Sequence, residues 1–537
     1  PICRSVLDGT DPNCVPYDVF SGAPISAAAI NYLSAVGFQR GQTNQQVGNV
    51  NFTGLLGEYG VKTPWAEDGL AVNIGAEYRK DSLKLDTDQA FRTGDLTGQG
   101  APTLPVSGNY RVLEWFAEAQ LPLVQNSFVE DLSLNAGYRK SYYKLSNGRK
   151  FDTDTYKLGL EFAPIKDVRL RGAYNRAVRA PNIQELFGPQ IVGLNGAGDP
   201  CGGRALTAAD IGCLVQFSQV NPGSVPADFI GRTIALNPAA QYNGFIGGNP
   251  NLEPEKATTK TLGVVLQPRF LPRFAFTVDY FNIKVKDAIQ GFGQDAILAQ
   301  CIAGTTSATN VDPSCALIRR NPANGSIWLT ADGFVIDLPN NVGSVKTSGF
   351  EFNSSYSRRV GGLGTASFSF VGTWLRKFVT NNGLTAPYDC AGYFGPTCSG
   401  GGTTSSAPQP KWRHKARLSL NTPGGIGLSV QWRYIDKVTS EFASGNPTLT
   451  DGNSYAFNEV LKAQNYFDLA ATATIGDNFN FRIGVNNIFD KSPPLVHSGS
   501  GNFGYSLCPT GPCNGNTFPG TYDSLGRYLY AGVTLDF

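Results

Sequence analysis

Apolar and polar residues alternate along much of this chain. In residues 72–79, Val72, Ile74, Ala76 and Tyr78 share one parity, and polar or small residues share the other. The same alternation recurs in segments 112–121, 132–139, 479–486 and 528–537. Because successive side chains of a β-strand point to opposite faces, this period of two predicts strands with one apolar and one polar face.

The pattern predicts fifteen strands, many of them ten or more residues long. Their approximate ranges are 46–60, 68–85, 110–121, 128–144, 153–163, 166–178, 256–267, 272–288, 343–357, 364–380, 411–422, 426–440, 464–476, 478–489 and 526–537. Globular proteins favour strands of about five or six residues, whereas a tilted bilayer crossing needs about 9–11. These lengths favour an all-β protein whose strands cross a membrane.

The connections between the predicted strands alternate between short and long. Short ones lie at residues 163–166, 268–272, 358–363, 423–425 and 476–478, and long ones at 179–255, 289–342, 381–410, 441–463 and 490–525. Short turns on one side and long loops on the other are typical of an outer-membrane antiparallel β-barrel with external loops. Within the loop 289–342, the apolar segments 327–329 and 334–336 flank Ala331, Asp332 and Gly333, which predicts a small hairpin.

Composition narrows the alternatives. A chain of 537 residues is too long for one ordinary soluble domain with a single core. Only 16% of its residues are charged and 63 are Gly, a composition that favours β structure. No run of eighteen apolar residues occurs and mean hydropathy is −0.17, which excludes a bundle of transmembrane helices but not a barrel. The net charge of +2 provides no strong field to attract nucleic acid, so we expect no nucleic-acid partner.

The ten cysteines fall into five close pairs. These are Cys3 and Cys14, Cys201 and Cys213, Cys301 and Cys315, Cys390 and Cys398, and Cys508 and Cys513. Each pair lies in a segment rich in Gly, Pro, Asn and Ser, so bonding between near neighbours is the simplest interpretation. Structural zinc is the competing one, but no pair has C-x-x-C spacing and the chain has only two histidines, so we expect no metal site. Local disulfides indicate an oxidising compartment such as the periplasm or the cell surface.

Four segments resemble the TonB-dependent outer-membrane transporters of Gram-negative bacteria. They are residues 175–187 (NRAVRAPNIQELF), 249–257 (NPNLEPEKA), 279–289 (DYFNIKVKDAI) and 484–491 (GVNNIFDK), the last followed by Pro493 and Pro494. They occur in the family's order and at the spacing of its barrel strands. The motifs fall within residues 110–537, and the earlier part of the chain matches by pattern only.

The resemblance implies a barrel of 22 strands closed around a plug. It also implies an outer-membrane location and uptake of a scarce nutrient, energised by TonB with its inner-membrane energising proteins, without a cofactor. The family's plug and TonB box have no counterpart in this sequence. Because fifteen strands are predicted where the family has 22, we expect residues 1–537 to be a partial barrel domain, with the plug and the first strands outside it.

Several charged residues lie on the polar parity of predicted strands and should face the barrel lumen. They are Arg169, Arg171, Glu114 and Glu118. An arginine on the lipid face would cost about 2–4 kcal/mol at the midplane. The two glutamates would lie about 13 Å apart, at roughly 3.3 Å per strand residue, which is too far for the carboxylate pair of a glycosidase. In the family such inward charges contact the plug, and simple solvation in the lumen is the alternative.

Aromatic residues next to one cysteine pair are candidates for ligand binding. Tyr388, Asp389, Tyr393 and Phe394 lie close to Cys390. Aromatic rings on a short, disulfide-closed loop suit stacking on a sugar or an aromatic chelator. Packing of the loops against one another is the alternative.

At the C-terminal end, Gly532, Leu535 and Phe537 resemble the signal by which bacterial barrel-assembly machinery recognises its clients. No G-x-S-x-G or phosphate-binding loop motif occurs, so we expect no enzyme and assign no catalytic residue.

Three functions stay open at this stage. The first is active import of a siderophore, an oligosaccharide or a cofactor across the outer membrane, with outer-membrane lipid and the small-molecule or oligosaccharide substrate as partners. The second is passive diffusion through a porin, and the third is a secreted β-rich adhesin or polysaccharide hydrolase. Dependence of uptake on the proton gradient separates the first two, and extraction into buffer without detergent identifies the third.

Overall fold

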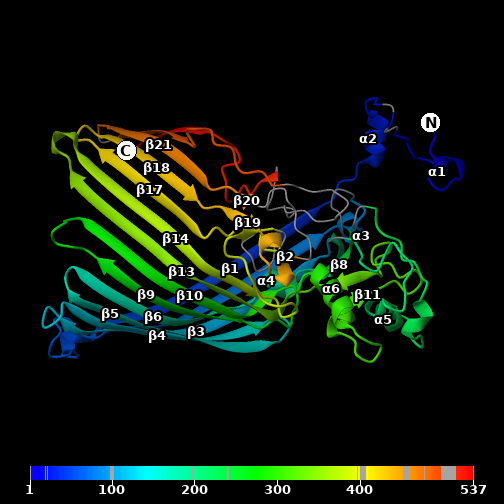
Figure 1. Cartoon of the computed structure of the whole chain (residues 1–537), viewed down its shortest axis with the longest axis horizontal. Coiled ribbons are helices and arrows are strands. Elements are labelled where there is room, and N and C mark those ends of the chain that lie inside the picture. Colours follow the sequence, from blue (N-terminus) through cyan, green and yellow to red (C-terminus); the bar gives the residue numbers. More distant parts are fainter. Residues whose placement is uncertain are drawn as a thin grey trace.

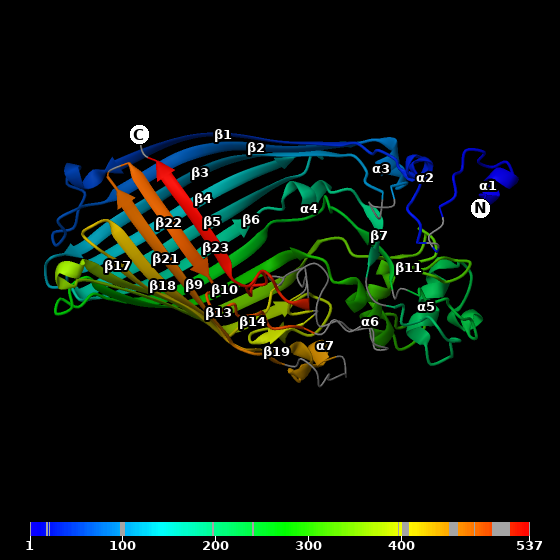
Figure 2. The ribbon, with the colours of Figure 1, turned by 90° about the horizontal axis from the view of Figure 1, so that it is seen from above.

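The computed structural model describes residues 2–17, 20, 22–96, 102–195, 198–238, 241–395, 397–399, 407–450, 460–476, 478–496 and 516–535. Its main element is one large, strongly curved antiparallel sheet (Figures 1 and 2). Loops and short helices gather at one end of this sheet, and short turns lie at the other (Figure 1).

Fifteen long strands follow one another across the sheet in chain order. They are β1 (Gln39–Leu55), β2 (Ala71–Thr87), β3 (Val106–Gln125), β4 (Asp131–Leu145), β5 (Lys150–Ile165), β6 (Val168–Arg179), β9 (Glu255–Leu266), β10 (Phe274–Gln290), β13 (Asn340–Arg359), β14 (Thr365–Asn381), β17 (Trp412–Asn421), β18 (Ile426–Ile435), β21 (Gln464–Ile475), β22 (Phe479–Asn486) and β23 (Tyr528–Leu535). The two-residue strand β15 (Tyr388–Asp389) adds to β14. All fifteen predicted strands are therefore confirmed.

Several predicted ranges are too long. The range 46–60 runs past β1, which ends at Leu55, into a 3₁₀ turn, and 478–489 runs past β22, which ends at Asn486. The range 426–440 was expected to be continuous, but β18 ends at Ile435 and residues 438–440 form β19 (Val438–Ser440) in a separate small sheet. The last ladder bond on this side is made by the Asp436 N–H, which donates to the carbonyl of Trp412 at 2.9 Å. The alternation did not reveal that the strand ends at Ile435, because Val438 falls on the same even-numbered positions as the apolar residues Val430, Trp432 and Tyr434.

The two faces of the sheet differ in polarity. On one face, large apolar side chains are exposed: Leu113 is 55%, Leu158 57% and Leu262 64% exposed. Aromatic rings on neighbouring strands touch there, as Phe350 does with Trp374 at a centroid distance of 5.6 Å. Water-soluble proteins avoid so wide an exposed apolar surface, whereas it matches the lipid-facing side of a barrel.

The other face is polar and concave. A single hollow on it touches residues of six consecutive strands, β1 to β6. The short helix α4 (Ile183–Phe187) packs onto this face near the loop end, in a cluster with Val112 of β3 and Tyr143 of β4. The polar face is therefore the inner side of the curved wall.

Within the described strands the barrel is not closed. β1 pairs only with β2, and β23 pairs only with β22, so the two edge strands do not meet. The sheet is an open, curved wall whose two edges keep unpaired backbone groups. In lipid each such group would cost several kcal/mol, so closure with further strands stays a prediction.

The loops carry the remaining elements. The helices are α1 (Arg4–Leu7), α2 (Ala27–Leu33), α3 (Gln89–Thr93), α5 (Ile211–Val220), α6 (Gln294–Gly304), α7 (Pro447–Thr450) and the 3₁₀ turns η1 (Leu56–Tyr59), η3 (Pro226–Phe229), η4 (Pro313–Leu317), η5 (Gly361–Leu363) and η6 (Glu441–Ala443). The small strands are β7 (Ile191–Asn195), β8 (Tyr242–Ile246), β11 (Ile318–Arg319), β12 (Phe334–Ile336), β16 (Tyr393–Phe394) and β20 (Val460–Leu461). Among the described helices, none has both the length and the apolar character needed to cross a membrane.

The hairpin predicted inside the loop 289–342 is wrong in its pairing. Residues 334–336 do form β12, but its antiparallel partner is β11, and its other neighbour is β8 from a different loop. The segment 327–329 is irregular, and the Ile327 carbonyl accepts a hydrogen bond from Asn243 instead. The position beside β12 that the segment 327–329 was expected to occupy is taken by β8 of another loop.

Candidate functional site

Ion pairs line the concave face on the β4–β10 side of the sheet. Arg171 donates from Nε and Nη2 to the two carboxylate oxygens of Asp279, at 2.8 and 2.7 Å. Arg169 donates from Nη1 to Asp131 at 2.7 Å and to Glu161 at 2.8 Å. The structure thus places both arginines on the polar face. Arg171 of β6 reaches across β9 to Asp279 of β10, and Arg169 is held by Glu161 of the neighbouring strand β5 and by Asp131 of β4. Contact of these side chains with a plug stays a prediction.

The two glutamates singled out in the sequence lie on the same face but in different surroundings. Glu114 is buried and accepts hydrogen bonds from Arg139 at 3.0 Å and from Ser141 at 2.5 Å. Glu118 is exposed and accepts one weak hydrogen bond from Asn73 at 3.4 Å. Glu114 therefore acts as a structural partner of the wall, whereas the Glu118 carboxylate is available to a ligand.

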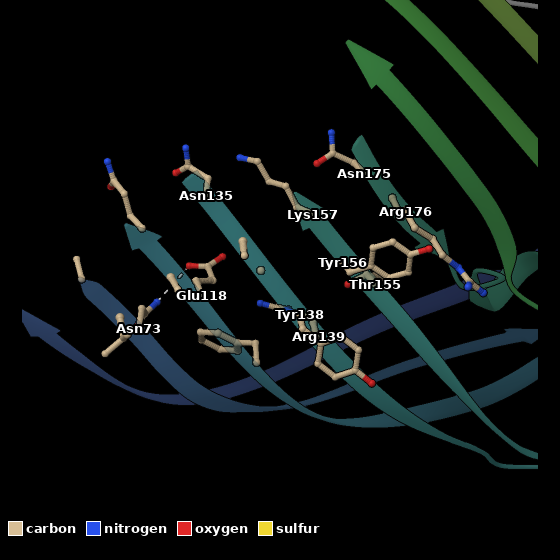
Figure 3. A pocket seen from close by; sticks show the side chains of 18 of the residues that line it. Asn73, Glu118, Asn135, Tyr138, Arg139, Thr155, Tyr156, Lys157, Asn175 and Arg176 are labelled. Carbon is tan, nitrogen blue, oxygen red and sulfur yellow. Dashed lines mark hydrogen bonds between the residues drawn. The ribbon is translucent and has the colours of Figure 1, made fainter. Parts of the chain in front are cut away.

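A hollow of about 560 Å³ lies on this part of the concave face. Its polar lining comes from strands β2 to β6 and includes Glu118, Arg139, Lys157, Asn135 and Asn175 (Figure 3). The Arg139 guanidinium lies over the Phe116 ring, 4.8 Å from its centroid. Amide, cationic and anionic groups together can bind a polar molecule or a polar segment of protein.

The part of the concave face formed by β17 carries more unpaired positive charge than the part formed by β4–β10. Arg413, Lys415 and Arg417 alternate along β17 on the polar parity, all exposed, and none of them makes an ion pair within the described residues. By contrast, Arg433 of the adjacent strand β18 pairs with Asp468 of β21 at 2.7 Å and with Asp523, which precedes β23, at 2.6 Å. The three β17 side chains form a strip that favours negative charge.

Two of the segments that resemble a known family meet at the loop end of the wall. Arg179 at the end of β6 donates to Glu185 in α4 and to Glu255 at the start of β9. Asn182 caps α4, and its side chain and that of Glu185 bond each other's backbone N–H groups. The N–H of Asn249 donates to the Glu185 carbonyl at 2.7 Å. These motif residues therefore fix where the long loop leaves and re-enters the sheet.

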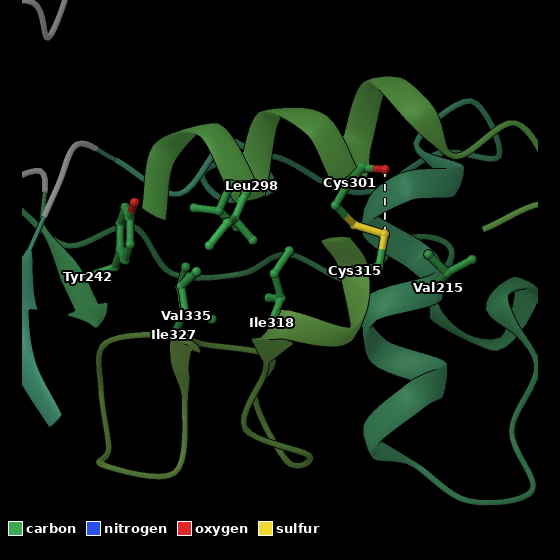
Figure 4. Close-up of a cluster of buried hydrophobic side chains, with 9 residues drawn as sticks. Val215, Tyr242, Leu298, Cys301, Cys315, Ile318, Ile327 and Val335 are labelled. Carbon is green, nitrogen blue, oxygen red and sulfur yellow. Dashed lines mark hydrogen bonds between the residues drawn. A yellow bond between two sulfur atoms is a disulfide. The ribbon is translucent and has the colours of Figure 1, made fainter. Parts of the chain in front are cut away.

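The loops after β6 and β10 fold together into one unit, which we call the first loop body (described residues within 180–254 and 291–339). Its sheet has the order β11-β12-β8-β7, so the strand pair of one loop lies beside the strand pair of the other, and β12 and β8 join the two loops. Its core includes Tyr242, Ile297, Leu298 and Val335, together with the Cys301–Cys315 disulfide (Figure 4). A second cluster of the same body surrounds the disulfide between Cys201 and Cys213.

Charged groups also hold the first loop body. Asp210, at the start of α5, accepts hydrogen bonds from Arg204 at 2.7 and 2.5 Å and from the Thr207 N–H at 2.7 Å. The Arg204 hydrogen bonds, aided by those of Thr207, lower the pKa of Asp210 below its ordinary value of 3.8. Inside the body, Arg320 pairs with Asp199 at 2.6 Å, with both side chains buried.

The loops after β14, β18 and β22 form the second loop body (described residues within 382–411, 436–463 and 487–527). β16, β19 and β20 make a small sheet between the first two of these loops. The buried Glu441 accepts hydrogen bonds from the N–H groups of Thr397 at 2.9 Å and Cys398 at 2.6 Å. Burial raises the pKa of Glu441, although these two backbone hydrogen bonds oppose the shift.

The predicted ligand residues all lie in the second loop body. Phe394 is fully buried, with its ring 6.2 Å from that of Phe518. Tyr388 is 7% exposed, and burial, aided by the Glu441 charge, raises its pKa to about 12. Asp389 accepts hydrogen bonds from the N–H groups of Phe378 and Ala391. Only Tyr393 keeps a partly exposed ring. The burial favours the packing interpretation for Tyr388 and Phe394, and ligand binding by this group stays a prediction.

Four of the five predicted disulfides are present. Cys3–Cys14, Cys201–Cys213, Cys301–Cys315 and Cys390–Cys398 are bonded, while Cys508 and Cys513 lie outside the described residues. Of the predicted assembly signal, Gly532 and Leu535 lie in β23 and Phe537 falls outside the described residues. Recognition by assembly machinery stays a prediction. In the part of the chain that the structure describes, no three His, Cys, Asp or Glu side chains gather as a metal site would require.

Sequence reasoning missed the two charges that organise the loop bodies, Arg320 and Glu441. Neither belongs to a motif, and each meets partners from distant segments, such as Asp199 or Cys398. A charged residue beside an apolar run, as Arg320 is beside Ile318, was the only available signal, and it does not identify a partner.

The chain was compared with known protein families and structures. A protein-family model described as "TonB dependent receptor-like, beta-barrel" matches residues 16–488. None of the curated proteins compared with the chain matches it.

Among solved structures, the chain is similar to a mutant of the ferric enterobactin receptor PfeA from Pseudomonas aeruginosa, with 16% identity and a TM-score of 0.54. It is also similar to the siderophore receptor PirA from Acinetobacter baumannii, with 15% identity and a TM-score of 0.50. The likeness covers 93% of this chain in both cases, but only 54% of the PfeA chain and 55% of the PirA chain. The chain thus spans about half the length of these structures, and the likeness concerns the fold.

Proposed function

The chain belongs to the TonB-dependent receptor-like β-barrel family, and from this premise we propose that it imports a scarce small nutrient across the bacterial outer membrane. The observation that carries the proposal is the pair of folded loop bodies at one end of a polar, concave wall. Loops with their own cores and disulfides suit selective capture, because little ordering entropy is lost on binding. A passive pore needs no such folded bodies.

Passage would follow the concave face. Its ion pairs, among them Arg171–Asp279 and Arg433–Asp468, keep the wall polar. Coupling to TonB would act through the family's plug, which we propose packs against this wall. The exposed Glu118 and Lys157 side chains and the partly exposed Asn175 side chain of the hollow are the groups that we propose it contacts.

An anionic nutrient fits the wall best. The strip of Arg413, Lys415 and Arg417 favours negative charge. Of the candidate substrates, a ferric siderophore brings such charge more often than an oligosaccharide does. We therefore propose a ferric chelate as the first substrate to test, with oligosaccharides and a cobalamin-like cofactor as the alternatives.

The test is uptake by a Gram-negative host that lacks its own siderophore receptors and expresses the full natural gene. We expect accumulation of radiolabelled iron from a supplied ferric chelate, and loss of that accumulation when a protonophore collapses the proton gradient. Uptake that survives the protonophore indicates a porin. Recovery of the protein in buffer without detergent indicates a secreted protein, and either result overturns the proposal.

Substitution of the β17 cations tests whether the substrate is anionic. Arg413→Gln, Lys415→Gln and Arg417→Gln together should reduce chelate uptake, while the exposed turn residues Lys62→Gln and Lys166→Gln should not. Equal uptake by both variants would remove the role assigned to the β17 strip.

A further inference from the structure

Four basic residues form a row across the apolar face of the sheet. Lys80 of β2 lies opposite Arg111 of β3, Arg111 opposite Lys144 of β4, and Lys144 opposite Lys150 of β5. Neighbouring strands are about 4.8 Å apart, so the row spans roughly 14 Å. Each of the four side chains lies on the face that also carries the exposed apolar residues; Arg111, for example, is two positions before Leu113 in β3.

These cations form no ion pair with any carboxylate that the structure describes. All four side chains are exposed. The nearest carboxylates on this face, Asp152 and Asp154, are already paired with Lys140. Like charges directly opposite one another destabilise a sheet, so folding alone gives no reason for this row.

The place of the row on the wall points to the kind of ligand. It lies at the loop end of the strands, where Lys144 and Lys150 flank the turn between β4 and β5. Towards the middle of the sheet the same face carries Tyr142 and Trp115 beside the mutually paired Lys140, Asp152 and Asp154, and then exposed apolar side chains such as Leu158. Cations that follow an aromatic band are expected at the level of the lipid headgroups.

We propose that Lys80, Arg111, Lys144 and Lys150 bind the phosphate groups of membrane lipids in the leaflet on the loop side of the sheet. This inference rests on the proposed outer-membrane location. Phosphates fit because each can bridge two adjacent cations, which removes the repulsion within the row. A lipid brings those phosphates to the row from the side, with its acyl chains against the apolar face below.

Lipid binding to the purified protein tests the site. The full protein in a neutral detergent is titrated with a bis-phosphorylated glucosamine lipid, and bound lipid is counted by native mass spectrometry. Neutralising one cation near a membrane surface weakens lipid binding about fivefold, so Lys80→Gln, Arg111→Gln, Lys144→Gln and Lys150→Gln together should weaken it several-hundred-fold. The variant should fold at least as well as the natural protein, because the repulsion is gone.

A matched variant controls for net charge. Lys62→Gln, Lys166→Gln, Arg358→Gln and Arg359→Gln remove four exposed cations at the turn end of the sheet and should leave lipid binding unchanged. Equal weakening in both variants, or in neither, overturns the proposal. Equal binding of the dephosphorylated lipid overturns it too, as does displacement of the lipid by an equimolar amount of inorganic phosphate, since that indicates a site for the free anion. None of these readouts uses transport, so a failed uptake assay leaves this test intact.

Discussion

Arg320 and Asp199 form an ion pair shielded from water, with 0% and 2% of their side chains exposed, although 121 residues separate them in the chain. Arg320 also donates to Gln216 Oε1 at 2.8 Å and to the Gly325 carbonyl at 2.9 Å. The pair joins the loop after β6 to the loop after β10. Two loops that emerge from different strand pairs are thereby held as one body.

Removing one partner of this pair should destabilise the first loop body strongly. Asp199→Asn leaves the Arg320 guanidinium buried without a counter-charge, which costs about 3–5 kcal/mol. Hydrogen exchange of the α5 and α6 amides should accelerate, while that of the barrel strands should not. The exposed pair Lys84–Asp86 provides the control: Asp86→Asn should cost less than about 1 kcal/mol. Similar effects of the two substitutions would contradict the burial argument.

The disulfide between Cys301 and Cys315 should stabilise the same body. Closing a loop of 14 residues contributes about 3 kcal/mol in the chain-entropy description. The double substitution Cys301→Ser and Cys315→Ser should therefore make the loop 291–339 sensitive to protease at concentrations that the natural protein resists. Loss of the Cys3–Cys14 disulfide, which lies in the N-terminal segment, should leave that sensitivity unchanged.

Acid should weaken the first loop body through Asp210. Hydrogen bonds from Arg204 and Thr207 hold the pKa of Asp210 below its ordinary value of 3.8, so its contribution is present above pH 3.8. That contribution is lost as the pH falls from 3.8 through the folded-state pKa. Asp210→Asn should lower local stability by about 1 kcal/mol at pH 7. The difference from the natural protein, followed by α5 hydrogen exchange, should shrink below pH 3.8, and a difference that stays constant would exclude this linkage.

Gly263 should be needed for the Arg171–Asp279 pair. A Cβ at residue 263 would lie 2.0 Å from Asp279 Oδ1 and 3.1 Å from Arg171 Nε, so Gly263→Ala displaces the ion pair. We expect a loss of about 1–3 kcal/mol, the usual range for overpacking, seen as a lower unfolding temperature in detergent. In the adjacent strand, a Cβ at Gly172 would have no neighbour closer than 3.8 Å, so Gly172→Ala should be tolerated. An unchanged unfolding temperature for Gly263→Ala would show that Asp279 can move at no cost.

Tyr393 and Phe394 should respond differently to truncation. Phe394→Ala removes a fully buried ring and should destabilise the second loop body by about 3–5 kcal/mol. Tyr393→Ala removes a partly exposed ring, so the body should stay folded while affinity for a bound ferric chelate or oligosaccharide falls. If ligand affinity, measured by tryptophan fluorescence, is unchanged in Tyr393→Ala, the predicted ligand role of this loop is wrong.

The strands of this protein could be predicted because their signal is local. Each residue from Val72 to Tyr78 faces either the apolar or the polar side of the sheet, and that choice is visible in the residue type itself. Close spacing made the disulfides predictable in the same way, since Cys301 and Cys315 have few other partners within reach.

The loop bodies could not be predicted in this way. β12 pairs with β11 and β8 rather than with the nearer segment 327–329, and Arg320 meets an aspartate from another loop. Polar and apolar residues in these loops follow no fixed period, because the loops fold around cores that several of them share. Which side chains become buried there, such as Phe394, depends on contacts between distant segments.

By itself, the sequence determined the fifteen strands, their two-faced character and the four described disulfides, because alternation and short spacing act between residues a few positions apart. Only the tertiary structure decided that two loops fold into one body and that four cations from four strands form one row. Those features arise from register and packing between segments far apart in the chain, whose free energies no local pattern contains.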